Sequence, residues 1–120
     1  MNKKWHIKNC PLSIVAEAFK KLYPNIEYEA FFETQIRDEE DGTKVYGLTD
    51  FGDDGSIFIF IDADLSIKNA TEIFAHELAH AAVGIGHGHD EEWEKAFDDI
   101  FEEYNTIGDM LFNTQERREE

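Results

Sequence analysis

The spacing of apolar residues divides the first half of the chain into one helical segment and three strands. Between residues 12 and 22 apolar side chains recur at helical spacing, which predicts a helix that begins near Pro11 and ends before Pro24. Residues 26–36 alternate instead, which predicts a half-buried strand. Its inner side should hold Ile26, Tyr28, Ala30, Phe32 and Ile36. Residues 45–49 predict a short strand, and the β-branched and aromatic run at 56–62 predicts a more buried one.

The pattern of the second half is typical of two helices joined by a glycine-rich loop. The first helix begins either at Asn69, which has Glu72 at capping-box spacing, or at the earlier cap Ser66. It should run to about Val83, where three glycines break it: Gly84, Gly86 and Gly88. Asp90 is a good N-cap for the last helix. The apolar face of that helix should consist of Trp93, Ala96, Phe97, Ile100, Phe101 and Tyr104. A polar tail follows from about residue 113.

This order of elements predicts a single α+β domain over residues 1–120, with helices packed on a small three-stranded twisted sheet.

The amino-acid composition disfavours several classes of binding partner and several compartments. The chain has 11 basic and 27 acidic residues, a net charge of −16, which disfavours contact with nucleic acid and anionic lipid. Its single cysteine excludes an internal disulfide, and no apolar run is long enough for a signal peptide or a membrane span. We expect a cytoplasmic monomer.

Residues 76–89, HELAHAAVGIGHGH, hold four of the five histidines of the chain and carry the candidate chemistry. On a helix, His76 and His80 lie four apart on one face and can bind one metal ion. Glu77 follows directly and can act as general base toward a metal-activated water. Catalytic zinc sites take three protein ligands, so His87 or His89 must supply the third. The alternative is that His76 and His80 are solvent-exposed or capping histidines that match the motif by chance.

His89 is the predicted third ligand, with His87 as the alternative. His89 adjoins Asp90, the expected cap of the last helix, and Trp93 can anchor that helix one turn later. One argument favours His87: it lies three residues after Gly84, a turn spacing that metzincins use. However, the glycines on both sides of His87 leave its backbone flexible.

Three other residues carry side chains that can take part in chemistry. Tyr46 could reach the cleft from the edge strand and hydrogen-bond an oxyanion, although such a tyrosine is more often an ordinary strand residue. His6 is expected to be a surface or packing residue. Cys10 is expected to be a small buried one.

The stretch HELAHAAVGIGHGHDEEW resembles the core of the SprT-like zinc metallopeptidases, especially the small forms found in phages and prophages. The family pattern continues from HExxH through a loop to a histidine, matched by His89, with an aromatic residue four positions later, matched by Trp93. The preceding VYGLTD and GSIFIFID also fit, so the similarity covers about residues 44–104. It implies a zincin-like fold in which the strand 44–49 flanks the cleft. Asp90 stands where the family usually has glycine.

The resemblance further implies that His76, His80 and His89 bind zinc and that Glu77 is the catalytic acid and base. The expected function is therefore a zinc-dependent peptidase, a hydrolase with one Zn²⁺ per chain, that binds an extended protein or peptide substrate along residues 44–49. The alternatives are a non-catalytic zinc-binding interaction module and an acidic decoy that mimics DNA. The presence of Glu77 argues against both, because a structural site needs no base.

Overall fold

The computed structural model describes residues 11–38 and 40–119, with side chains as far as residue 111. His6 and Cys10 therefore lie outside the described residues. Six elements follow in the order α1 (Pro11–Leu22), β1 (Glu29–Glu33), β2 (Gly47–Phe51), β3 (Ile57–Asp62), α2 (Ile67–Val83) and α3 (Glu91–Glu119). This order confirms the predicted α+β class, with one helix, three strands and two helices.

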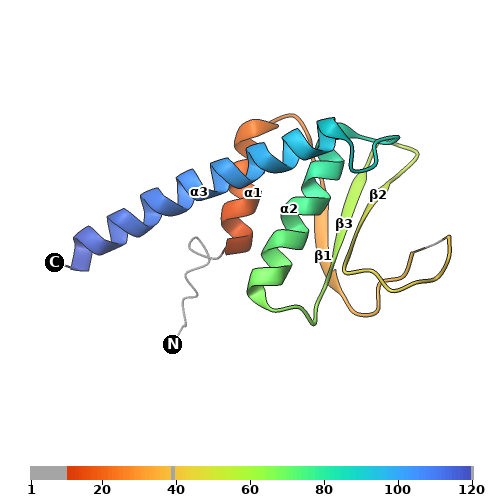
Figure 1. The fold of residues 1–120 in the computed structure, drawn as a ribbon, viewed down its shortest axis with the longest axis horizontal. Coiled ribbons are helices and arrows are strands. Elements are labelled where there is room, and N and C mark those ends of the chain that lie inside the picture. Colours follow the sequence, from red (N-terminus) through yellow and green to blue (C-terminus); the bar gives the residue numbers. More distant parts are fainter. Residues whose placement is uncertain (1–10, 39, 120) are drawn as a thin grey trace.

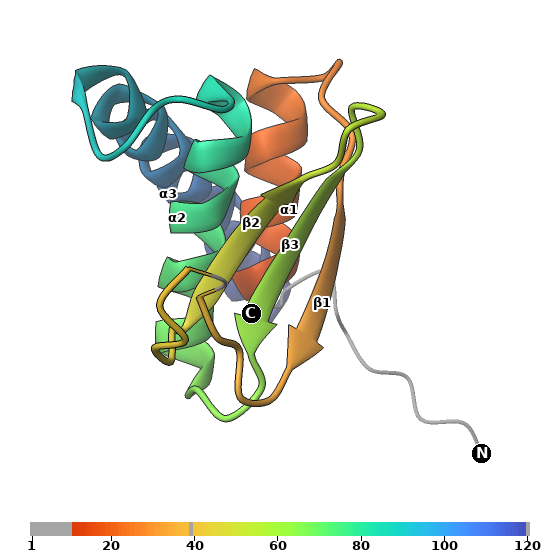
Figure 2. The same cartoon turned by 90° about the vertical axis from the view of Figure 1, so that its right-hand side faces the viewer.

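The three strands form one mixed sheet in the order β1-β3-β2, so the most apolar strand is central. β1 pairs with β3 in parallel, and β2 pairs with β3 antiparallel. The helices lie against one face of the sheet, and the other face carries no helix among the described residues (Figures 1 and 2). Because side chains alternate along β3, Ile59 and Ile61 are buried under the helices, and Phe58 and Phe60 stand next to Phe31 of β1.

β1 is shorter and more exposed than the sequence predicts. All five of its residues are exposed, and the side chain of Phe32 is 57% accessible. Ala30 and Phe32 line an open hollow of about 240 Å³ beside α1 and Phe74. They are not buried as predicted, because β1 is an edge strand with no helix packed closely over it. Of the predicted inner residues, Ile36 is buried, whereas Ile26 and Tyr28 are partly buried against the core.

α2 crosses the sheet and contacts both β2 and β3. Ser66 caps its first turn, since its side chain accepts a hydrogen bond from the amide of Asn69 at 3.2 Å. Of the two predicted caps, the structure selects the earlier one. The helix ends at Val83 as predicted, with Gly84 at a φ of 89°, a left-handed conformation that glycine adopts without strain. Small residues on the inner face, including Ala75 and Ala79, allow α2 to lie close to its neighbours.

α3 lies across α1 and α2 and continues beyond them, through the polar segment predicted from about residue 113, to Glu119 (Figure 1). Ala96 and Ile100 on its inner face are buried. Phe101 was predicted on the same face, but its side chain is 51% exposed because it lies at the margin of the contact with α2. Among the described residues, no helix is both long and apolar enough to cross a membrane.

Candidate metal centre

Three imidazoles converge at the end of α2. His76 and His80 come from two successive turns of this helix, and His89 reaches them from the loop before α3. The Nε2 atom of His89 lies 3.2 Å from Nε2 of His80 and 3.1 Å from Nε2 of His76. The first two imidazoles are half-buried and the third is exposed, so the group opens to solvent on one side.

The spacing of these nitrogens fits a metal ion better than it fits hydrogen bonds. A tetrahedral zinc with Zn–N bonds of about 2.0–2.1 Å requires ligand atoms roughly 3.3 Å apart. The two Nε2 separations from His89, 3.1 and 3.2 Å, are close to that value, and all three ligand atoms lie within 4.8 Å of one another. In contrast, one imidazole nitrogen carries either a proton or a lone pair, so Nε2 of His89 cannot form good hydrogen bonds to two similar neighbours. The three side chains can hold a metal ion.

Burial keeps the two helical imidazoles neutral, which is the form that binds a metal. Desolvation, followed by the nearby His80 and His89, lowers the pKa of His76 to about 4. The pKa of His80 is lowered for the same main reason, with a further contribution from His89 and an opposing one from Asp90. A proton therefore competes with a metal for His76 only in strongly acidic solution.

Asp90 fixes the loop that carries the third imidazole. One of its carboxylate oxygens accepts a hydrogen bond from the amide of Trp93 at 3.0 Å and caps α3. The other lies 2.8 Å from Nδ1 of His87. His87 thus lies outside the imidazole group, and its pKa is raised chiefly by this hydrogen bond. The structure brings His89, and not His87, together with the two helical histidines.

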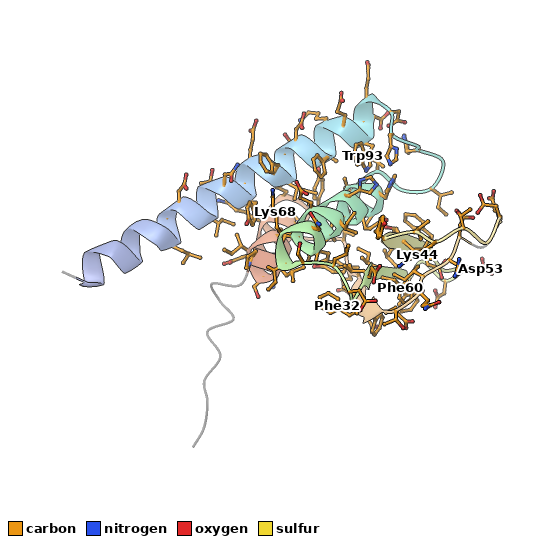
Figure 3. The ribbon with its side chains drawn as sticks, turned by 60° about the horizontal axis from the view of Figure 1, so that its bottom comes forward. Phe32, Lys44, Asp53, Phe60, Lys68 and Trp93 are labelled. Atoms are coloured by element: carbon orange, nitrogen blue, oxygen red, sulfur yellow. The ribbon has the colours of Figure 1, made fainter. Side chains whose placement is uncertain are left out.

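Trp93 forms one wall of the group. Its ring centroid lies 4.8 Å from that of His76, 5.6 Å from that of His80 and 4.6 Å from that of His89. Its indole N–H points to the carbonyl oxygen of His76 at 3.3 Å, and the ring stacks on Phe97. Figure 3 shows Trp93 where the first turn of α3 meets the end of α2. The tryptophan therefore joins the two helices at the point where the three imidazoles meet.

Glu77 points away from solvent toward β2, with only 6% of its surface exposed. Its Oε1 accepts a hydrogen bond of 2.6 Å from the hydroxyl of Thr49. Burial raises the pKa of the Glu77 carboxyl, and the hydrogen bond from Thr49 partly opposes this effect. A carboxylate with a raised pKa next to a possible metal site is suited to general-base chemistry.

The contact between Glu77 and Thr49 was not predicted from the sequence. The two residues are 28 positions apart, and no local pattern links them. One signal was available: Gly47 interrupts an otherwise strand-like run, and such a glycine often marks a close approach of another segment.

Tyr46, which was predicted as a possible contributor to the cleft, is 55% exposed and is not part of the imidazole group. Its side chain lines a hollow of about 370 Å³ together with Leu65, which precedes α2, and with Asn69, Glu72 and Ile73 of α2.

No protein-family model, curated protein or solved structure matches this chain.

The first prediction separates the two candidate third ligands. Structural zinc sites bind with about 10–16 kcal/mol over four ligands, so loss of one ligand should cost roughly 3 kcal/mol, about a hundredfold in Kd. We expect His89→Ala to show this loss in competitive titration with a chromophoric chelator. His87→Ala removes an imidazole that contacts Asp90 and Glu92 but lies outside the imidazole group, and it should stay within roughly tenfold of the parent, the low end for groups that orient ligands. The opposite order of the two variants would contradict the assignment.

The second prediction concerns the metal-free protein. The pKa of His76 is about 4 in the folded chain and 6.5 in an unfolded one, so between these values only the unfolded state takes up the proton. This residue therefore favours unfolding increasingly as the pH falls through that range. We expect the free energy of unfolding of the parent, minus that of His76→Gln, to decrease from pH 6.5 to pH 4 in urea titrations. A difference independent of pH would show that His76 titrates normally.

Proposed function

We propose that this protein is a zinc-dependent endopeptidase of the SprT-like kind. The observation that carries the proposal is the convergence of three imidazole nitrogens, on an HExxH helix, next to a buried glutamate on the same helix. His76, His80 and His89 are the proposed zinc ligands. Three protein ligands with one open side are the arrangement of catalytic zinc sites, whereas structural sites use four.

When bound, Zn²⁺ supplies a Lewis acid that polarises a peptide carbonyl and makes water more acidic. Glu77 supplies the proton transfers. Its carboxylate accepts a proton from the attacking water and then delivers it to the nitrogen of the leaving amine. The raised pKa of Glu77 supports this role, because a base that must also act as an acid works best when its pKa lies near the operating pH.

The proposed substrate is an extended protein or peptide segment that pairs with β2. β2 lies at the edge of the sheet and contacts α2, so its free edge is next to the helix that carries the proposed ligands. The hollow lined by Tyr46 and Ile73 lies one helical turn before His76 and can accept a substrate side chain. The net charge of −16 favours a cationic segment and disfavours DNA.

The third prediction tests catalysis. Glu77→Gln keeps the size of the side chain and an oxygen that can accept the hydrogen bond from Thr49, but it removes the base. We expect it to bind zinc like the parent and to hydrolyse fluorescein-labelled casein at least ~10²-fold more slowly, the low end of general-base contributions. The control is the parent treated with chelator and then reloaded with zinc.

Two outcomes would count against the proposal. Equal rates for the parent and Glu77→Gln would show that Glu77 is not the base. Stoichiometric zinc with no hydrolysis of casein, or of a mixed peptide library, would favour the non-catalytic module or the acidic decoy.

A further inference from the structure

We infer that β2 positions the proposed general base, with Thr49 holding one carboxylate oxygen of Glu77 and Gly47 making room for the other. Thr49 is a positioning residue in this inference, since it acts through Glu77. The inference rests on the proposed function for its catalytic consequence. Its structural part, the placement of the carboxylate by the strand, can be tested without any substrate.

Thr49 contacts Glu77 twice. Its hydroxyl oxygen lies 2.6 Å from Oε1 and 3.0 Å from the main-chain carbonyl oxygen of the same residue. A hydroxyl has one proton, and the shorter distance to a charged acceptor indicates that the proton is donated to the carboxylate. The contact thus fixes the end of a long, flexible side chain relative to its own backbone, because both acceptors belong to one residue.

Gly47 lies two residues before Thr49, so both face α2 from the same side of the strand. A β-carbon at this position would lie 2.9 Å from Oε2 and 3.0 Å from Cγ of Glu77, and 2.5 Å from Cγ2 of Ile73. Only glycine leaves this space open to the carboxylate. Any larger residue at position 47 would force the helix, or the side chain of Glu77, away from the strand.

Together the two positions give the oxygens of Glu77 different roles. Oε1 is occupied by the hydroxyl of Thr49. Oε2 lies over Gly47 and has no hydrogen bond among the described residues, so it is the oxygen left to accept the proton of the attacking water. General-base catalysis depends on placement within hydrogen-bonding reach of that water, and a carboxylate held at one oxygen loses little freedom when it reacts.

The fourth prediction uses a matched set of threonine variants. Thr49→Val keeps the shape of the side chain and removes the hydroxyl, whereas Thr49→Ser keeps the hydroxyl. Thr71→Val is the control, because the hydroxyl of Thr71 also bonds a carbonyl oxygen within the α2 region, that of Ile67 at 2.7 Å, but does not contact Glu77. All four proteins are loaded with zinc and compared in zinc affinity, in hydrolysis of fluorescein-labelled casein and in crystal structures.

We expect Thr49→Val to lower kcat by about tenfold to a hundredfold, the range for a hydrogen bond to a charged group. KM and zinc affinity should change by less than about twofold, because the contact acts on the chemical step and not on binding. Thr49→Ser should restore most of kcat, and Thr71→Val should match the parent. A threonine that merely fastens β2 to α2 would instead change stability and zinc affinity, with no selective effect on kcat.

The crystal structures decide the matter independently of activity. In the zinc-loaded parent and in Thr49→Ser, the carboxylate of Glu77 should stay against β2; in Thr49→Val it should rotate or occupy several positions while the three imidazoles remain in place. An unchanged carboxylate in Thr49→Val would overturn the inference. If the parent does not cleave casein but the carboxylate moves as expected, the proposed function fails while the positioning by β2 stands.

Discussion

The site depends on the close approach of three imidazoles, in which Nε2 of His89 lies 3.1 Å from Nε2 of His76 and 3.2 Å from Nε2 of His80. Burial disfavours a charge on His76, and the neighbouring His80 and His89 add to this effect, which is why the pKa of His76 falls to about 4. The remaining structure maintains this arrangement. The helical repeat of α2 aligns the first two imidazoles, and the cap at Asp90 together with the ring of Trp93 holds the third against them.

The same helix faces β2, and this second contact brings the proposed base to the site. Glu77 follows His76 in the sequence and therefore points to a different side of the helix, toward the strand that carries Gly47 and Thr49. One element thus carries two of the proposed ligands on one side and turns the carboxylate toward the sheet on another. β2 lies at the edge of the sheet, where the proposed peptide substrate would pair with it.

The parts of this arrangement that depend on local spacing were predictable from the sequence, and those that depend on tertiary contacts were not. His76 and His80 follow from the helical repeat, and the cap at Asp90 gave a physical reason to prefer His89 over His87. The burial predicted for β1 was wrong at Phe32, because alternation indicates which side a residue faces but not whether a helix covers it. The hydrogen bond from Thr49 joins a strand to a helix 28 residues later, a distance over which periodicity carries no information.

Anomalous diffraction at the zinc edge from crystals of the metal-loaded protein tests the central claim most directly. A catalytic zinc centre should give one peak at the imidazole group, with Nε2 of His76, His80 and His89 at about 2.0–2.1 Å and a fourth position that no protein atom fills. Glu77 should lie outside the coordination sphere, against β2. No peak at this group, or a fourth protein ligand that closes the coordination sphere, would contradict a catalytic metal centre.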